Sequence, residues 1–367
     1  MTVKTSMELN PLREKIKSAR EAYYNLDPII SDQEYDALID ELKSLNPQDE
    51  EVTKVGAAVS KHSVWEKVEH TIPMGSLDKV NSKDEFMKWV EETKAKKFLI
   101  TYKIDGSSME LVYKQGKLVR CVTRGDGKIG EDVTRNVIQI PTVLKEISET
   151  GDTTIRGEVV MYKDVFNAKY AHKYANPRNT AAGRVRDKKD GGKDCENLTF
   201  LAYTIISENK IPTEEGQFIV LRELGFETPM YSCGGSFEMD EYYRGTKRFR
   251  EDLPYEIDGM VVRVDDVAAQ EELGELNMRP KGQVAWKFDP SMAQTKVINI
   301  RWSIGTSGRI TPVAEVEPVG IGGVTITSIS LHNLAIFKDL ALFKGCRVLI
   351  ARRGDVIPYI EGNLDKI

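Results

Sequence analysis

The chain has 367 residues, of which 40% are hydrophobic and 30% charged, with a formal net charge of −5. Since single cores stop growing at roughly 250–300 residues, two or three domains are expected. The sequence contains no apolar run of the roughly 18 residues that a membrane span needs, and no signal-peptide core, so it predicts a cytoplasmic protein outside the membrane classes.

The four cysteines and four histidines are scattered along the chain without a C-x-x-C pair. This pattern predicts reduced thiols, no zinc in this chain and no metal-ligating cluster. The acidic balance leaves nucleic acid open as a partner, because binding depends on where the cations gather rather than on the total charge.

Helical spacing marks the beginning of the chain. Apolar side chains follow the i, i+3, i+4, i+7 pattern at Tyr35, Leu38, Ile39 and Leu42. Asp32 or Ser31 is the candidate N-cap of this helix. We therefore expect a small helical domain over residues 1–66.

Residues 67–296 carry β-rich runs mixed with helical patterns. The β-rich runs are 98–104, 108–113, 117–124, 153–162, 198–206, 257–264 and 283–288. Gln115–Gly116 is expected to form a hairpin turn, and the helical pattern from 213 is expected to stop at Gly225. Strands beside strands, mixed with helices, predict an α+β domain.

From residue 297 to 367 the chain is almost entirely strand and glycine, with one short helical stretch. Several short strands with one helix predict a small OB-fold barrel. The fold class predicted for the whole chain is therefore α+β and multidomain.

Charged residues recur inside the apolar strands of the middle region. Strand alternation puts Lys103 and Asp105 on one face, and Arg156 and Glu158 on one face of another strand. Later strands carry Asp258, Arg263 and Lys287. Each alone reads more simply as a solvated strand face, whereas together they suit a cleft for a phosphate ester and a metal.

The order of these blocks resembles the NAD-dependent DNA ligases of the bacterial type, over nearly the whole chain from Tyr23 to Tyr359. The similar blocks are "YKIDGSS", "TRGDGKIGEDVTRNV", "RGEV", "ANPRNTAAG", "IDGMVVRV", "VAWKF", "TPVAEVEPV", "SLHN" and "GDVIP". The resemblance implies a nucleotidyltransferase domain of the ATP-grasp-like ligase kind. It also implies that NAD adenylylates Lys103 with release of nicotinamide mononucleotide. AMP then passes to the 5′-phosphate of a DNA nick, and the 3′-hydroxyl seals the strand.

The stretch "YYNLDPIISDQEYDALIDEL" is similar to the helical domain that grips the nicotinamide mononucleotide half of NAD in this family. By that resemblance, the grip consists of Tyr23, Asp32, Tyr35 and Asp36. Aromatic rings and carboxylates suit the cationic nicotinamide ring and the ribose hydroxyls.

The resemblance also assigns the nucleotide site. Asp105 and Glu158 would contact the ribose or metal-bound water, whereas Arg124 and Lys287 would bind ribose or phosphate. Ser76 and Leu77 fall in the adenosine pocket, and the cofactor site is completed by Thr101, Asp258 and Arg263. Phosphate chemistry implies Mg²⁺ or Mn²⁺. The pKa of a lysine, ordinarily about 10.4, must be lowered in the nucleophile, and neighbouring cations would do so.

Two departures from the family pattern bear on the nucleotide. Thr101 stands where the family usually has glutamate, so an acceptor for the adenine amino group is missing or replaced by the hydroxyl. Arg263 stands where the family usually has lysine, which keeps the charge but trades a compact ammonium for a planar fork.

A basic stretch in "ANPRNTAAGRVRDKK" is predicted to be a short, glycine-containing loop that contacts DNA phosphates through Arg178, Arg184 and Arg186, with Lys188 and Lys189. The OB-fold domain adds Arg309, Arg352 and Arg353. The implied partner is nicked double-stranded DNA, bound through its backbone. On composition alone, a solvated basic loop is an equal alternative.

Full-length members of the family continue with zinc-finger, helix-hairpin-helix and BRCT domains, which this sequence lacks. We therefore expect a catalytic fragment, a short form, or one subunit of a split enzyme such as a viral ligase in the host cytoplasm, with those domains on a second chain. Two alternatives stay open. One is an ATP- or GTP-using polynucleotide ligase or capping-type enzyme, and the other is a catalytically silent nucleic-acid-binding subunit.

Overall fold

The structure is a computed structural model that describes residues 6–25, 30, 32–54, 57, 65–174, 176–189, 191–288, 291–304, 310–321, 324–331, 334–353 and 357–366. The chain forms two compact units, Met1–Pro28 with Leu42–Phe288 and Ile29–Glu41 with Asp289–Ile367. Within the described ranges, no helix is both long and apolar enough to cross a membrane.

The N-terminal part is helical, as the apolar spacing predicts. It contains α1 (Ser6–Asn25), α2 (Asp32–Leu45) and α3 (Glu50–Thr53). The guanidinium of Arg20 on α1 pairs with Glu51 on α3, and the carboxylate of Asp49 caps α3 by accepting from the Glu51 N–H. The candidate N-cap Ser31 and the side chain of Asp32 lie outside the described residues.

The middle region contains a five-stranded sheet in the order β2-β13-β10-β3-β9. Its strands are β2 (Asp78–Val80), β13 (Gln283–Lys287), β10 (Ile257–Val264), β3 (Phe98–Ile104) and β9 (Tyr231–Gly234). All neighbours are antiparallel except β2 and β13. The strand predictions for 98–104, 257–264 and 283–288 are thereby confirmed.

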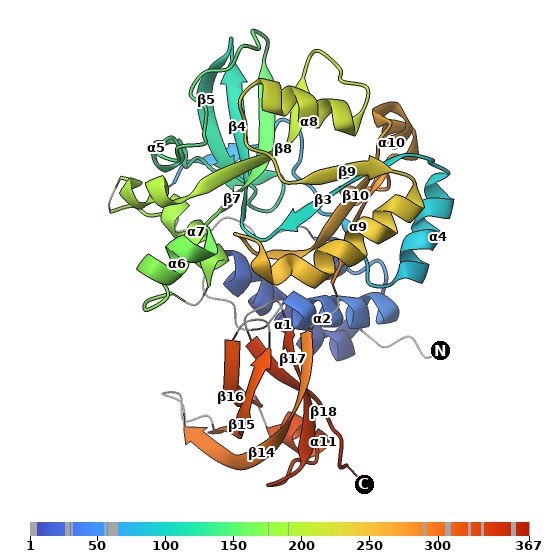
Figure 1. The fold of residues 1–367 in the computed structure, drawn as a ribbon, viewed down its shortest axis with the longest axis vertical. Helices are drawn as coiled ribbons and strands as arrows, with labels where there is room; N and C mark the ends of the chain where they lie inside the picture. The colour runs from blue at the N-terminus through green and yellow to red at the C-terminus, as the bar shows by residue number, and fades with distance from the viewer. Residues whose placement is uncertain are drawn as a thin grey trace. The chain divides into compact units, whose positions relative to one another are not determined.

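Helices α4 (Lys83–Thr93) and α9 (Ser236–Phe249) cover one face of this sheet (Figure 1). Phe98, Ile100 and Tyr102 of β3 point into that core, where the ring of Trp286 stacks between Phe86 and Tyr243 at 4.1 Å from each. Because strand side chains alternate, Thr101 and Lys103 point to the opposite face.

A four-stranded antiparallel sheet has the order β5-β4-β7-β8. Its strands are β4 (Ser107–Lys114), β5 (Lys117–Thr123), β7 (Thr153–Val160) and β8 (Thr199–Ser207). Gln115 and Gly116 join β4 to β5 with φ of 49° and 75°. These left-handed values are those of a type I′ hairpin turn, so the predicted hairpin is confirmed.

Short helices pack beside the second sheet. They are α5 (Thr134–Val137), α6 (Lys163–Lys169), α7 (Pro177–Val185) and α8 (Glu214–Glu223), and α10 (Val267–Leu273) follows β10. Thr213 caps α8 by accepting from the Gly216 N–H, and Gly225 with φ of 97° follows its end as predicted. Further short elements are β1 (Lys67–Glu69) with β6 (Ile129–Glu131), β11 (Glu275–Leu276) with β12 (Arg279–Pro280), and the 3₁₀ turns η1 (Lys193–Asn197) and η2 (Arg250–Asp252).

The C-terminal sheet has the order β16-β15-β14-β17-β18. It comprises β14 (Ser291–Ile304), β15 (Ile310–Ile321), β16 (Val324–Ser330), β17 (Arg347–Arg353) and β18 (Ile357–Asn363), with α11 (Leu334–Asp339). The long strand β14 pairs with β17 through its first half and with β15 through its second, so the sheet curls around one core. The α+β class and the OB-fold prediction are confirmed. The boundary at residue 297 stays a prediction, and β14 already begins at Ser291.

Candidate active site

Lys103 lies near the end of β3, on the face of the sheet opposite the α4 and α9 core. The register pairs Gly259 of β10 with Lys103 on one side and with Lys287 on the other. Because directly opposed residues share a face, both lysines flank the glycine on the same side of the sheet.

Asp258 joins the two lysines. Its Oδ2 accepts hydrogen bonds from Lys103 Nζ at 2.9 Å and from Lys287 Nζ at 3.1 Å. The register of β10 against β3 shifts between Ile257 and Gly259, so Asp258 is an extra residue at a bulge. A bulge re-aims a side chain, which explains why Ile257 joins the core while its neighbour faces the lysines.

The charge of this group is set by burial and by the lysines. Burial alone would raise the pKa of Asp258. The two ammonium groups lower it by a larger amount, so its pKa lies well below the usual range. The other oxygen, Oδ1, is buried and has no hydrogen-bond partner among the described residues. A buried carboxylate oxygen without a partner is the kind of ligand that a hard divalent cation takes.

Glu158 of β7 is the second buried carboxylate near the lysine. Ser108 on the neighbouring strand β4 donates its hydroxyl to Glu158 Oε2 at 2.9 Å. Burial raises the pKa of Glu158 to about 7, although the charges of Arg178, Arg124 and Lys103 oppose the shift. The prediction that Arg156 and Glu158 share a face is confirmed. They are directly opposed to Glu110 and Ser108 on β4, which are two residues apart and therefore lie on one face of the sheet.

Asp105 and Arg178 form an ion pair that brings α7 to the end of β3. The stretch that carries Arg178 was predicted to be a glycine-containing loop, and this is wrong, because residues 177–185 form helix α7. Asn176 caps the helix by accepting from the Asn179 N–H at 2.7 Å, and Pro177 occupies its first turn. A capping asparagine followed by proline is a helix start, and the single Gly183 does not interrupt it.

The two other arginines of this stretch make contacts inside the protein. Arg184 is bound by Asp194, by Asp187 and by the hydroxyl of Tyr174. Arg186 pairs with Glu131 at 2.7 Å. Lys188 and Lys189 are exposed.

A network that the sequence reasoning missed fastens the segment 70–77, which includes Ser76 and Leu77. Glu110 accepts from both His70, at 3.1 Å, and Arg156, at 3.0 Å. Arg156 also donates to the carbonyl oxygens of Ile72 and Pro73. In the sequence, the only indication of this network is Glu110, a glutamate within the otherwise apolar run of β4.

The same network also reaches the backbone of Arg124, another predicted site residue. His70 Nε2 lies 3.2 Å from the carbonyl oxygens of Thr123 and Arg124. The backbone of Ser76 donates to the carbonyl oxygen of Met278 at 3.2 Å. The segment that carries Ser76 and Leu77, and the backbone of Arg124, are therefore linked through His70, Glu110 and Arg156 to the sheet that contains Glu158.

Arg263 is buried on the face of β10 that carries Gly259. Its Nη1 donates to the carbonyl oxygen of Tyr203 at 3.1 Å and to Glu214 Oε2 at 3.3 Å. Thr101 of β3 is also buried and lies diagonally across from it, since the register pairs Thr101 with Val261. The structure thus brings together Lys103, Asp258 and Lys287, with Thr101 and Arg263 farther along the same face.

Seven predicted residues are not part of the group that the structure describes. The side chains of Tyr23, Asp32, Arg352 and Arg353, and all of Arg309, lie outside the described residues. Tyr35 and Asp36 are half-buried on α2, in the part of the chain that belongs to the second compact unit.

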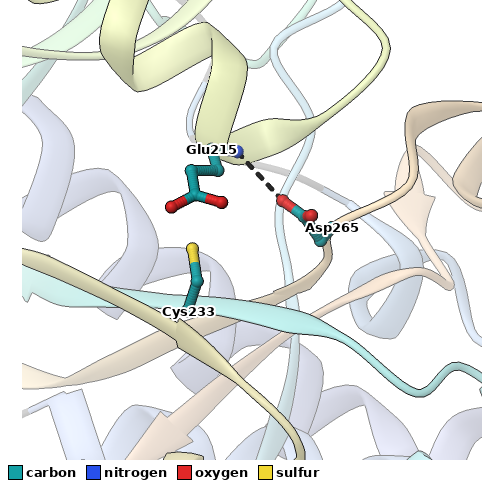
Figure 2. A group of neighbouring side chains, drawn as sticks. All are labelled: Glu215, Cys233 and Asp265. Atoms are coloured by element: carbon teal, nitrogen blue, oxygen red, sulfur yellow. Dashed lines mark hydrogen bonds between the residues drawn. The ribbon is translucent and has the colours of Figure 1, made fainter.

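A cluster of Glu215, Cys233 and Asp265 has the composition of a metal site (Figure 2). However, the Lys97 ammonium already lies 2.7 Å from Glu215 and 2.9 Å from Asp265. Burial raises the pKa of Cys233 to about 12, so the sulfur is a thiol rather than a thiolate ligand. The two carboxylates of the cluster are therefore ion-paired with Lys97, and Asp265 also accepts from the Glu215 N–H at the start of α8.

Comparison with known proteins identifies the family. Residues 2–55, 62–291 and 294–366 match the models for the N-terminal NAD⁺-binding, adenylation and OB-fold domains of NAD-dependent DNA ligases. The DNA ligase of Sorangium cellulosum is 39% identical over 99% of this chain and 57% of its own length. The DNA ligase of Hydrogenobaculum sp. is 38% identical over 96% of this chain and 55% of its own length.

The chain thus spans little more than half the length of these relatives. The matched domains nevertheless follow one another along the whole chain and include every residue of the lysine and carboxylate group described above. The chain therefore belongs to the NAD-dependent DNA ligase family.

Proposed function

We propose that this chain is the catalytic core of an NAD-dependent DNA ligase, with Lys103 as the residue that carries AMP. The observation that supports this most strongly is the pair of lysines held at one oxygen of Asp258, at 2.9 and 3.1 Å. Two cations and a buried carboxylate at a strand end suit the transfer of a phosphoryl group.

The first step is attack of Lys103 Nζ on the adenylyl phosphorus of NAD. A nitrogen–phosphorus bond forms, the phosphorus–oxygen bond of the pyrophosphate breaks, and nicotinamide mononucleotide leaves with the bonding electrons. The Lys103 ammonium first loses one proton to water, which frees the electron pair that attacks, and the nitrogen loses a second proton to water as the neutral phosphoramidate forms. Asp258 orients the amine before attack, and Lys287 stabilises the charge that develops on the phosphoryl oxygens.

We infer the remaining nucleotide contacts from the family resemblance. The charge of Lys103 acts on Glu158, and Asp105 follows Lys103 by two residues. Both carboxylates would accept hydrogen bonds from the ribose hydroxyls or from metal-bound water. Arg124 would bind phosphate or ribose, and Ser76 and Leu77 would line the adenosine pocket. Asp258 Oδ1 and Glu158 are the oxygens that suit Mg²⁺ or Mn²⁺. A bound divalent cation would neutralise the phosphate oxygens.

The nicotinamide mononucleotide half of NAD would be held by the N-terminal helices. The match of residues 2–55 to an N-terminal NAD⁺-binding domain supports this assignment. Tyr23, Asp32, Tyr35 and Asp36 are the residues we propose for it, through stacking on the nicotinamide ring and hydrogen bonds to ribose.

The second and third steps would act on nicked double-stranded DNA. AMP passes from Lys103 to the 5′-phosphate, and the 3′-hydroxyl then displaces AMP. Arg178, Arg184 and Arg186 with Arg309, Arg352 and Arg353 are the proposed phosphate contacts. Since the relatives are nearly twice as long, a second chain carrying further domains remains part of the proposal, as does a cytoplasmic location.

Covalent labelling tests the proposal. Incubation of the purified chain with NAD and Mg²⁺ is expected to add one adenylyl group to Lys103, detected by mass spectrometry of the intact protein and of its peptides. Lys103→Ala should abolish the adduct, whereas Lys114→Ala, an exposed lysine at the end of β4, should keep it. Label acquired from ATP alone, or no adduct at all, would contradict the proposal.

A further inference from the structure

The face of the sheet that carries Lys103 also offers a surface for the base of the nucleotide, and this argument rests on the proposed function. Thr101 lies two residues before Lys103 on the same face of β3. Two residues of a strand span about 7 Å, which is close to the distance from the first phosphate of a nucleotide across its ribose to the base. A nucleotide attached at Lys103 is therefore long enough for its base to lie at Thr101.

Arg263 lies beside Thr101 on the neighbouring strand. The register pairs Val261 with Thr101 and Arg263 with Leu99, so Arg263 is the diagonal neighbour of Thr101 on that face. Diagonal neighbours in a sheet are about 7–8 Å apart, within reach of a long side chain. The side chains of Thr101 and Arg263 can thus contact one planar base.

The Arg263 guanidinium is held in place but retains an unused donor. Glu214 and the Tyr203 carbonyl oxygen accept from its Nη1, and its guanidinium carbon lies 5.7 and 5.8 Å from the ring centroids of Tyr203 and Phe218. Its Nε is buried and has no hydrogen-bond partner among the described residues. A buried donor without a partner indicates a ligand that brings an acceptor.

Carboxylate acceptors are scarce on this surface. Asp258 is the only acidic residue in β3, β10 and β13, and it is bound to the two lysines at the phosphate end. Glu214 is engaged by Arg263 and by the amide of Gln270, which donates to Oε1 at 2.7 Å. Away from the phosphate end, the polar side chains of these strands on this face are the Arg263 guanidinium, which only donates, and the Thr101 hydroxyl and Gln283 amide, which both donate and accept.

This set of groups does not distinguish purines by the group at position 6. Adenine presents an amino donor there and a 6-oxopurine presents an acceptor oxygen, whereas both present N7 as an acceptor. Arginine most often binds the oxygen and N7 of a 6-oxopurine together. A carboxylate would accept only from the amino group and would repel the oxygen.

We propose that the base subsite formed by Thr101 and Arg263 accepts nicotinamide dinucleotides of 6-oxopurines as well as NAD, so that Lys103 takes up inosine monophosphate from nicotinamide hypoxanthine dinucleotide. The reaction is the same phosphoryl transfer, with one nitrogen–phosphorus bond formed, one pyrophosphate bond broken and nicotinamide mononucleotide released. Glu214 acts as a positioning residue that holds the Arg263 fork toward the base.

The direct test needs no variant. The purified chain is mixed with Mg²⁺ and either NAD or nicotinamide hypoxanthine dinucleotide, and the single-turnover rate of adduct formation is measured by intact-protein mass spectrometry over a range of concentrations. The second-order rate constants are expected to agree within about tenfold, since no group rejects the oxygen. A hypoxanthine rate constant lower by more than that factor would overturn the inference.

Two substitutions test the residues. Thr101→Glu adds a carboxylate acceptor, and the preference for NAD over the hypoxanthine dinucleotide should rise at least about tenfold above that of the wild type. Arg263→Lys keeps the charge opposite Glu214 but removes the fork, and it should slow the hypoxanthine dinucleotide more than NAD. A preference unchanged in both folded variants would contradict the assignment of the base to this surface.

The outcomes also separate this inference from the proposed function. An adduct from NAD but not from the hypoxanthine dinucleotide would overturn the inference alone. No adduct from either dinucleotide would instead contradict the proposed function, and with it the basis of the inference.

Discussion

Asp258 holds two lysines through one carboxylate oxygen, which makes it the residue on which the geometry of the proposed nucleophile depends. Without its charge, the ammonium groups of Lys103 and Lys287 would repel each other at close range. Because the folded-state pKa of Asp258 is depressed, the stability it contributes is present above its ordinary pKa and is lost as the pH falls through the acid range.

Asp258→Asn is therefore expected to lower the rate of adenylylation by about a hundredfold through misplacement of the amine. It should also destabilise the fold by about 1–3 kcal/mol, because two partly buried ammonium groups lose the carboxylate charge between them. Single-turnover labelling and denaturant unfolding measure these effects. Asp152→Asn, an exposed aspartate before β7, serves as the matched control. Equal labelling rates in the two variants would contradict the role of Asp258.

Glu158 is the residue whose ionisation opposes folding. Its pKa rises from an ordinary value of 4.5 to about 7, chiefly because it is buried. Between these values the folded state binds more protons than the unfolded state, so the stability falls as the pH rises from about 4.5 to about 7. The loss then persists at higher pH.

Glu158→Gln removes the ionisation and is expected to raise the unfolding free energy of the nucleotide-free protein at pH 8 by about 1–3 kcal/mol. Its melting temperature should change less between pH 5 and pH 8 than that of the wild type, while adenylylation is lost. The control is Glu92→Gln, an exposed glutamate on α4. Parallel melting curves for the wild type and Glu158→Gln across this pH range would refute the prediction.

At the scale of the element, the site depends on how closely three strands approach each other. Gly259 of β10 lies opposite Lys103 of β3 and Lys287 of β13. A Cβ at this glycine would lie 2.4 Å from the carbonyl oxygen of Trp286 and 3.0 Å from the Cα of Lys287. Because both are backbone atoms, a side chain here would push β13 away from β10.

Gly259→Ala is accordingly expected to destabilise the protein by about 1–3 kcal/mol and to weaken adenylylation by moving Lys287 away from Asp258. Gly245→Ala on α9 is the matched control, because a Cβ there meets no atom within 4 Å. In that helix, alanine should stabilise by about 0.5–1 kcal/mol. Thermal unfolding and labelling measure both variants. A stable, fully active Gly259→Ala protein would show that the strands can separate without cost.

At the scale of the whole molecule, the proposed steps differ in their need for DNA. Adenylylation from NAD uses the lysine and carboxylate group alone, whereas sealing requires cationic contacts to the phosphate backbone. The net charge of −5 gives no general attraction for DNA, so local arginines must supply the binding. Each phosphate contact releases counterions and makes binding weaker as salt rises.

With nicked duplex at limiting concentration, the sealing rate of the purified chain should fall about tenfold or more between roughly 50 and 200 mM salt. The rate of adenylylation by saturating NAD should change far less over the same range. Gel assays of sealing and intact-protein mass spectrometry follow the two reactions in parallel samples. An equal loss of both rates would argue against backbone contacts as the source of the salt effect.

Local patterns in the sequence were enough to determine most of the secondary structure. The run 98–104 alternates between residues that point into the α4 and α9 core and residues on the opposite face of the sheet. The helix from 214 has its cap and its glycine stop in the sequence itself. The ordered motifs also identified the family and singled out Lys103. The prediction of a glycine-containing loop is wrong at residues 177–185, where the Asn-Pro start caps helix α7 and one glycine does not interrupt it.

Only the tertiary structure decided which charges meet. Lys103 and Asp258 are 155 residues apart in the chain. Asp258 faces the lysine because of a β-bulge, which the alternation of side chains along this strand does not predict. The pairing of Arg263 with Glu214, and of Glu110 with both His70 and Arg156, likewise depends on strand register and on helix placement. A sequence determines where a strand can form because side-chain alternation is local. The partner of a buried charge is decided by packing between distant segments.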